Sequence, residues 1–238
     1  MEITSLEINK SPLFRRINST RTLPRQNYYT LALNGEFAHR AFDEERAPLN
    51  KGRWRSQVFQ KEESIPLDLE IGTGTGTFFA YQAMMAPQRL LIGMELKYKP
   101  LIQSIRRALV AGAQNAAICR FHSFNTSELF SQGELNDIYI HFPDPWVTPR
   151  KPQNRTVNAA LLQVLHGLQR PESKIYFKTD SREYFLWALE EIKNTPYQLS
   201  YQTLDLHQSE KSQQNYVTGF EKIFHSQGIQ INYLELSR

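Results

Sequence analysis

Short apolar runs recur along the chain from residue 65 onward, and helical segments separate them. Each run has the length of a strand and is rich in β-branched or aliphatic residues, which is typical of buried strands. We expect such strands at residues 65–71, 89–95, 117–121, 137–141 and 174–178. Strands that alternate with helices form parallel sheets with right-handed crossovers. The pattern therefore predicts an α/β fold with a doubly wound, mostly parallel sheet.

The segments around these strands fit the same plan. Residues 77–85 have a helical pattern directly after the first strand. Pro100 opens a second helix, and proline suits the first turn of a helix. Residues 197–204 and 229–236 resemble a final pair of strands. This pair predicts an antiparallel closing strand at one side of the sheet.

Length and composition are those of one globular domain with an extension. The chain has 238 residues, of which 40% are hydrophobic and 22% charged, enough for a sizeable core. We assign residues 65–238 to the domain, and the polar, irregular residues 1–64 to an N-terminal extension. The single cysteine, Cys119, excludes an internal disulfide and lies in a short apolar run, so we expect a buried thiol.

No stretch of the sequence has the character of a membrane-directed segment. No apolar run approaches the roughly 20 residues that span a bilayer. The N-terminus mixes Glu, Asn and Lys with apolar residues, unlike the apolar core of a signal peptide. A lone cysteine also suits a reducing compartment. We expect a cytoplasmic protein without a membrane partner.

Basic residues gather in two stretches that contain no acid, although the formal net charge is only +4. One stretch contains Lys10, Arg15, Arg16, Arg21 and Arg25, and the other contains Arg150, Lys151, Arg155 and Arg170. Such clusters attract phosphate backbones through charge and counterion release. They are equally compatible with a solvated basic surface, so the charge distribution alone leaves both interpretations open.

A glycine-rich turn follows the first strand. Gly72, Gly74 and Gly76 have the spacing Gly-x-Gly-x-Gly, which differs from the Gly-x-Gly-x-x-Gly of dinucleotide-binding turns. Glycines let the chain turn tightly and let a ligand approach the backbone. Glu70, just before the turn, can accept the ammonium group of a methionine moiety. The same carboxylate would repel the pyrophosphate of a dinucleotide such as a nicotinamide cofactor.

Two further polar residues follow the next two strands. Glu95 ends the second strand, where a carboxylate can hold both hydroxyls of a ribose. Asn125 follows the third strand, where an amide can contact an adenine edge or, alternatively, cap a helix. The carboxyl ends of parallel strands meet along one edge of a sheet. The ordered set of Glu70, Glu95 and Asn125 therefore predicts an S-adenosylmethionine site.

The fourth strand ends in a proline-flanked aspartate, within Phe142-Pro143-Asp144-Pro145-Trp146. Two prolines restrict the backbone around Asp144 and so hold its carboxylate in place. An aromatic residue two positions later can stack on a base. The motif predicts nucleobase recognition, and its alternative is a structural turn with a core tryptophan. His141, just before the motif, is more typical of a strand-end residue than of a catalyst.

Five motifs, in this order, resemble those of the bacterial tRNA (guanine-N7)-methyltransferases over roughly residues 50–238. They are Lys51-Gly52-Arg53-Trp54, the Leu-Glu-Ile-Gly turn, Phe-Pro-Asp-Pro-Trp, Thr179-Asp180 and Thr218-Gly219-Phe220-Glu221. The resemblance implies a class I methyltransferase fold with S-adenosylmethionine as cofactor. It also implies transfer of the methyl group to guanine N7 in the variable loop of tRNA (position 46 in tRNA numbering).

The resemblance further implies roles for individual residues. It places Glu70, Glu95, Asn125 and Asp144 at cofactor contacts, beside the glycine turn, and makes Asp144 the catalytic residue. The residues it implies in substrate binding are Thr148, Arg150, Arg155, Asp180, Thr218, Phe220 and Glu221. Asp180 and Thr218 also have, or nearly have, capping-box spacing to Glu183 and Glu221, which is the alternative structural role.

Two other functions are compatible with these residues. Methyltransferases that act on an exocyclic amine also carry a proline-flanked polar residue after the fourth strand, typically Asp/Asn-Pro-Pro-aromatic. A relative that binds tRNA without turnover would explain Thr148, which stands where the family usually has a lysine, in a thinner basic run. Such a relative would not need Glu70 and Glu95. We expect tRNA as the partner, no metal, and either a monomer or a homodimer.

Overall fold

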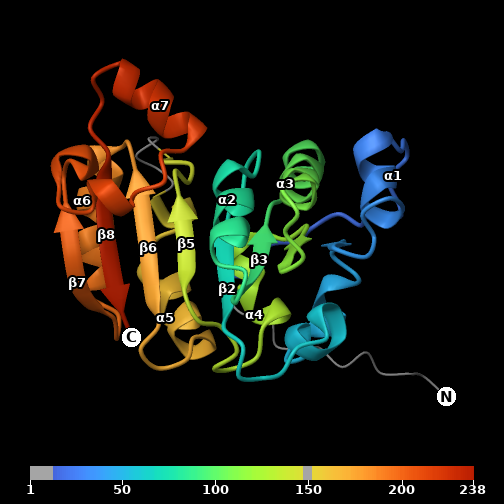
Figure 1. Ribbon diagram of the computed structural model, residues 1–238. Coiled ribbons are helices and arrows are strands. Elements are labelled where there is room, and N and C mark those ends of the chain that lie inside the picture. The colour runs from blue at the N-terminus through green and yellow to red at the C-terminus, as the bar shows by residue number, and fades with distance from the viewer. Residues whose placement is uncertain (1–12, 147–151) are drawn as a thin grey trace.

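The computed structural model describes residues 13–146 and 152–238 (Figure 1). Within these ranges, eight strands form one sheet in the order β1-β4-β3-β2-β5-β6-β8-β7. The strands are β1 (Ala41–Phe42), β2 (Leu67–Ile71), β3 (Leu90–Met94), β4 (Ala116–Cys119), β5 (Ile138–His141), β6 (Lys174–Thr179), β7 (Gln198–Thr203) and β8 (Asn232–Ser237). All neighbouring strands are parallel except β8, which is antiparallel to β6 and β7. The predicted fold, with its antiparallel closing strand, is confirmed.

Helices cover both faces of the sheet, and α7 (Gly219–Ser226) lies near the carboxyl ends of β5 and β6 (Figure 1). One face carries α1 (Tyr28–Asn34), α2 (Thr77–Met85) and α3 (Tyr98–Val110). The other carries α4 (Thr126–Leu129), α5 (Ala159–Leu168) and α6 (Arg182–Ile192). Short helical turns complete the described chain: η1 (Ala47–Asn50), η2 (Trp54–Phe59), η3 (Ser123–Asn125), η4 (Pro152–Asn154), η5 (Leu206–Gln208) and η6 (Ser212–Gln214).

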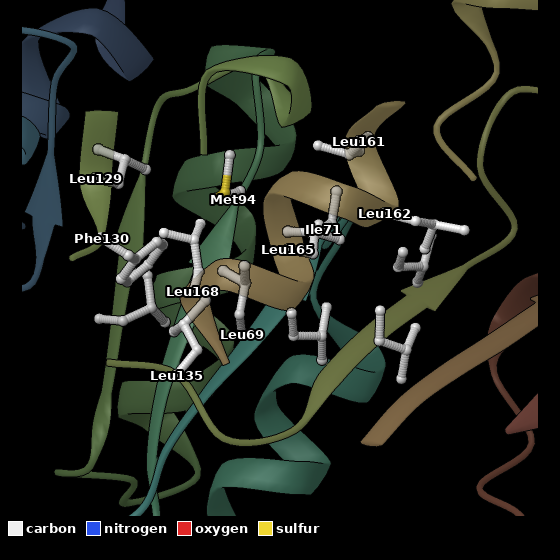
Figure 2. Packing of buried hydrophobic residues seen from close by; sticks show 14 of the residues in the cluster. Leu69, Ile71, Met94, Leu129, Phe130, Leu135, Leu161, Leu162, Leu165 and Leu168 are labelled. Carbon is white, nitrogen blue, oxygen red and sulfur yellow. The ribbon is translucent and has the colours of Figure 1, made fainter. Parts of the chain in front are cut away.

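The sheet separates two hydrophobic cores, because successive residues of a strand point to opposite faces. In β3, Ile92 and Met94 join the core beneath α5 and α6, whereas Leu91 joins the core beneath α1, α2 and α3. Figure 2 shows part of the first core, where the leucines of α5 lie against side chains of β2 such as Leu69. Each fully buried aliphatic side chain contributes roughly 1.5–3 kcal/mol. Because side chains are buried on both faces of the sheet, the ends of the strands that carry the site are held rigidly.

The predicted N-terminal extension contributes to the same sheet and core. β1 extends the sheet by pairing with β4, so that Ala41 lies opposite Ile118. Trp54 in η2 is fully buried, and its indole nitrogen donates a hydrogen bond to the carbonyl of Leu129 at 2.8 Å. The division of the chain into an extension and a domain stays a prediction. Residues 41–59 nevertheless pack against β4 and α4, which belong to the predicted domain.

The bounds of two helices and the state of the one cysteine agree with the sequence-based expectations. α2 has the predicted bounds, and α3 begins at Tyr98, which places Pro100 in its first turn. Cys119 is a free, buried thiol, and its burial raises its pKa. Among the described residues, every helix is too short or too polar to span a bilayer. The same residues contain no group of three or more His, Cys, Asp or Glu side chains arranged to hold a metal ion.

Candidate active site

A cavity of about 670 Å³ opens at the carboxyl ends of β2, β3, β4 and β5. Most of its wall comes from the segments that follow these strands, within residues 70–78, 94–97, 121–124 and 141–146. Arg15 from the N-terminal segment and residues at the start of α7 also line it. A volume of this size holds a small organic molecule. The parallel sheet has thus gathered distant parts of the sequence around one cavity.

The glycine turn forms one wall of this cavity. Gly72, Gly74 and Gly76 have φ angles of +81°, +53° and +76°, a region that residues with side chains rarely adopt. A Cβ at Gly72 or Gly74 would meet nothing within 4 Å, whereas one at Gly76 would lie 2.4 Å from the Cα of Ser104 in α3. Gly72 and Gly74 line the cavity, and Gly76 does not. The first two glycines keep the wall open, while Gly76 lets α3 approach the turn.

Glu70 is a buried cavity residue with an unsatisfied carboxylate. Only 2% of the residue is exposed, and its Oε2 atom has no hydrogen-bond partner among the described residues. Burial, and secondly the charge of Glu95, raise the pKa of Glu70 to about 8. A buried carboxylate is costly unless a cation or a donor binds it. The site therefore suits a ligand with a positively charged group.

Glu95 bridges the loops after β2 and β3. Its Oε1 accepts a hydrogen bond from the amide of Lys97 at 2.8 Å, and its Oε2 accepts one from the amide of Gly74 at 3.1 Å. Burial raises the pKa of this carboxyl as well. A carboxylate has about four acceptor positions, so Glu95 can accept further hydrogen bonds from ligand hydroxyls. Its fixed position is compatible with the predicted ribose contact.

Asn125 is near the cavity, but its amide is engaged elsewhere. The residue is 1% exposed and does not line the cavity, although its neighbours Ser123 and Phe124 do. Its Oδ1 accepts a hydrogen bond from the backbone N–H of Arg15 at 2.8 Å, and its Nδ2 donates one to the carbonyl of Arg15 at 2.7 Å. Asn125 occupies the N-cap position of α4, as the helix-cap alternative predicts, but its side chain makes no capping hydrogen bond. Its adenine contact stays a prediction.

Asp144 is an exposed residue that lines the cavity, and the backbone of the turn around it is constrained. Phe142 and Trp146 have φ angles of +50° and +44°, which cost a non-glycine residue on the order of 1–3 kcal/mol each. Arg155 supports the turn, because its Nε donates a hydrogen bond to the carbonyl of Pro145 at 2.8 Å. Trp146 is 40% exposed, so the alternative of a core tryptophan is wrong. The turn instead presents a carboxylate and an indole at the cavity.

Arg155 itself is buried rather than presented to solvent. It is 3% exposed, and its Nη2 donates to Oε1 of Glu183 at 2.6 Å. Its guanidinium also lies over the rings of Tyr184 and Trp187, at 5.2 and 5.0 Å from their centroids. These contacts give Arg155 a structural role beneath the Asp144 turn. Its predicted contact with the substrate stays a prediction.

The remaining residues implied in substrate binding are distributed differently. Thr218 and the exposed Phe220 line the cavity, whereas Asp180 and Glu221 do not. Two predicted residues lie outside the described part of the chain: Thr148 and Arg150. The start of α7 is therefore the part of this set that the fold brings to the cavity.

Helix capping explains why Glu221 does not line the cavity. Thr218 and Glu221 form the predicted capping box: the N–H of Glu221 donates to Oγ1 of Thr218 at 3.2 Å, and the N–H of Thr218 donates to the Glu221 carboxylate at 3.3 Å. Glu221 is fully buried and also pairs with Lys178 at 3.4 Å. The cap of α6 is Ser181, not Asp180, so the capping alternative is wrong for Asp180.

Several cavity residues, among them Arg15, Phe78 and His141, are not among the residues that the sequence assigns to the site. The ring centroids of Phe78 and His141 lie 4.3 Å apart. Nδ1 of His141 has no hydrogen-bond partner among the described residues, and burial together with the charge of Lys178 holds its pKa well below the ordinary value. The ring is therefore neutral near pH 7. Along β5, buried and partly exposed residues alternate, and His141 is a partly exposed residue at the carboxyl end of the strand, which is a sequence signal for a site residue. No sequence feature near Arg15 indicates that this residue reaches the cavity.

Comparison with known proteins identifies the family. A family described as "Putative methyltransferase" matches residues 64–234. A tRNA (guanine-N(7)-)-methyltransferase of Bdellovibrio bacteriovorus is 58% identical over 208 residues, which cover 87% of this chain and 100% of that protein. The chain belongs to the tRNA (guanine-N7)-methyltransferase family. Another member of this methyltransferase family, from Lactococcus lactis subsp. cremoris, is 32% identical over 78% of this chain and 84% of its own length.

Solved structures agree with the methyltransferase fold of the family. A SAM dependent methyltransferase from Aquifex aeolicus superimposes with a TM-score of 0.50 at 10% identity, covering 77% of this chain and 92% of that one. At this identity, the likeness concerns the fold alone. The family therefore rests on the sequence relatives, and the fold agrees with it.

Proposed function

We propose that this chain transfers the methyl group of S-adenosylmethionine to N7 of a guanine in tRNA. The relative that is 58% identical over 87% of this chain carries that activity in its name. The structural observation that carries the proposal is one cavity that joins Glu70 to the constrained Asp144 turn. The Glu70 carboxyl is buried, and its Oε2 has no partner among the described residues. One part of the cavity suits a cationic amino-acid moiety, and the other suits the edge of a purine.

The cavity residues fit S-adenosylmethionine. Glu70 would bind the ammonium group, and Glu95 would bind the hydroxyls of the ribose. Gly72 and Gly74 leave room for the ligand beside the backbone. When bound, the cofactor supplies an electrophilic methyl group on a sulfonium sulfur. Glu70 in turn disfavours a ligand whose pyrophosphate would lie beside the glycine turn.

Guanine N7 carries an in-plane lone pair and no proton, so its methylation needs no general base. The lone pair forms the new N–C bond while the C–S bond breaks, and the electrons of the broken bond remain on sulfur. Positive charge moves onto the purine. The protein has to hold N7 in line with the methyl group, and positioning of this kind contributes up to roughly 7–11 kcal/mol. His141, whose pKa is well below the ordinary value, is a poor proton acceptor. This agrees with a reaction that needs no general base.

Asp144 is the residue to which we assign the orientation of the guanine. Its carboxylate can accept hydrogen bonds from the N1–H and the exocyclic amine, and its charge favours the cationic purine that forms. The prolines on both sides and the support from Arg155 limit its movement. Trp146 is exposed beside it and can stack on a base. In this proposal, Asp144 both orients the base and stabilises the transition state.

The target that we propose is the variable-loop guanine (position 46 in tRNA numbering), as the family resemblance implies. Thr218 and Phe220 at the start of α7 line the same cavity and can contact the RNA around the target base. Arg16 is exposed and can bind an RNA phosphate. Because tRNA is its proposed substrate, we place the activity in the cytoplasm.

Methyl transfer to unmodified tRNA, followed by nucleoside mass spectrometry, tests the proposal. The matched control is the same tRNA with its variable-loop guanine replaced by adenine. We expect 7-methylguanosine on the first tRNA and none on the second. A methylated exocyclic amine would move the target and overturn the assignment to N7. Binding of cofactor and tRNA without any methylation would instead favour a non-catalytic relative.

A further inference from the structure

We propose that Arg15 is a cofactor-site residue and that Asn125 is the positioning residue that holds it at the cavity. The inference rests on the proposed function, because it concerns the S-adenosyl ligand of the same cavity. It assigns to Arg15 a role different from that of a general RNA-binding cation. It also assigns to the amide of Asn125 a partner in the protein instead of the adenine.

The amide of Asn125 binds both peptide groups of Arg15. It accepts from the N–H at 2.8 Å and donates to the carbonyl at 2.7 Å, although the two residues are 110 positions apart. The amide is almost completely buried. An asparagine side chain offers a donor and an acceptor at once, whereas an ionised aspartate offers acceptors only. An aspartate at this position would therefore face the Arg15 carbonyl with a second acceptor and release the segment.

A second anchor holds the same segment five residues later, where Thr20 is buried. Oγ1 of Thr20 donates to Oε2 of Glu44 at 2.8 Å, and the Thr20 backbone N–H donates to the same carboxylate. Arg120, at the end of β4, pairs with Glu44 at 2.6 Å and donates to the carbonyl of Asn18 at 2.8 Å. Residues 15–20 are thus fixed at both ends as a strap across the carboxyl end of β4.

The strap brings the guanidinium of Arg15 to the cavity. It lies over the ring of Phe124, at 5.0 Å from the centroid, and Arg15 and Phe124 both line the cavity. Phe124 follows β4, whereas Glu70 lies near the carboxyl end of β2 and Glu95 directly follows β3. If Glu70 binds the ammonium and Glu95 the ribose, the next position along the sheet is that of the adenine. A guanidinium stacks well on a flat aromatic ring and carries donors suited to purine nitrogens.

The two neighbouring arginines therefore differ in role. Arg15 lines the cavity, while Arg16 is exposed and does not. Because the strap forms part of the wall, an adenosyl ligand should stabilise the docked strap, and a released strap should bind the ligand less tightly. Affinity for the cofactor then depends on residues that the sequence places far from every other part of the site.

Binding of S-adenosylhomocysteine in the absence of RNA tests the inference, using isothermal titration calorimetry on the full chain. We compare the wild type with Arg15→Ala, Asn125→Asp and the matched control Arg16→Ala. We expect Arg15→Ala and Asn125→Asp each to weaken binding by about tenfold or more, as for the loss of a buried hydrogen-bonding partner. Arg16→Ala, which removes the same charge one residue away, should bind as the wild type does.

Hydrogen exchange provides a readout that is independent of activity. In the wild type, S-adenosylhomocysteine should slow exchange at residues 15–20, and in Asn125→Asp these amides should exchange faster even without ligand. Arg15→Ala keeps the backbone bonds to Asn125, so it tests the side chain should Asn125→Asp fail to fold. Wild-type affinity in Arg15→Ala overturns the role of Arg15 alone. Failure of the wild type to bind S-adenosylhomocysteine overturns the proposed function, and the inference with it.

Discussion

Glu95 lies close enough to Glu70 for its charge to raise the pKa of the Glu70 carboxyl, in addition to the effect of burial. Glu95 is held by two backbone amides, whereas Glu70 has an oxygen without a partner in the described chain. The cavity therefore contains one fixed anion and one carboxyl whose ionisation depends on what binds beside it. Both pH dependences below follow from this pair.

Replacement of Glu70 by glutamine should stabilise the cofactor-free protein at neutral and higher pH. The folded-state pKa of about 8 exceeds the ordinary value of 4.5, so the stability that Glu70 contributes is complete below pH 4.5 and is lost as pH rises through 8. We expect the free energy of unfolding of Glu70→Gln to exceed that of the wild type by on the order of 4 kcal/mol at pH 8. Urea denaturation across the pH range measures this. A difference that does not change with pH would contradict the assigned cause.

Cofactor binding should release a proton near neutral pH. An ammonium group binds the ionised form of Glu70, whose pKa in the free protein is about 8, so affinity for S-adenosylhomocysteine should fall as pH is lowered from 8 to 6. The limit is about tenfold per pH unit for a single linked proton. Calorimetry in two buffers with different ionisation enthalpies counts the protons released. Glu70→Gln is the control and should bind weakly, with little dependence on pH between 6 and 8.

Substitution of Asp144 by asparagine should slow methyl transfer more than it weakens binding. The amide keeps the size of the side chain but loses the charge that favours the cationic purine, and loss of one such interaction costs roughly a hundredfold in rate. Single-turnover kinetics at saturating tRNA and cofactor measure the effect. A rate within a factor of about two of the wild type would remove Asp144 from its proposed role.

Arg155 and Arg16 should respond differently to substitution by alanine. Arg155→Ala removes a buried guanidinium that supports the Asp144 turn, so we expect a loss of about 2 kcal/mol in stability and slower turnover. Arg16→Ala should leave stability unchanged and reduce the salt dependence of tRNA binding by about one phosphate contact. Thermal unfolding and binding titrations at several salt concentrations separate the two effects. A reduced salt slope in Arg155→Ala, with unchanged stability, would restore Arg155 as a phosphate contact.

The sequence predicts the fold well because the fold depends on local periodicity. The apolar strands and the helices between them lie where the pattern indicates. The glycine turn, Glu70, Glu95 and Asp144 reach the cavity because each lies at or just after the carboxyl end of a parallel strand. The place of such residues in the fold can be predicted without information on distant contacts. The order of the strands then brings them together.

The sequence predicts poorly where a side chain has a distant partner. Asn125 follows its strand as expected, yet its amide is engaged by Arg15, and no local pattern indicates a contact across 110 residues. Arg155 belongs to a basic stretch, but its burial against Tyr184 and Trp187 depends on how α6 packs. Charge along a sequence therefore indicates an RNA-binding surface only where the folded chain leaves that charge in solvent.

The contact between Trp54 and Leu129 also has a consequence for how the protein folds during synthesis. The indole of Trp54 finds its hydrogen-bond acceptor 75 residues later in the chain, and β1 pairs with β4 across a similar separation. Residues 41–59 therefore leave the ribosome well before their partners exist, and contacts of long sequence separation form slowly. Until β4 and α4 emerge, Trp54 lacks the partners that bury it, so we expect the nascent chain to be more open to aggregation and to chaperone binding in that interval.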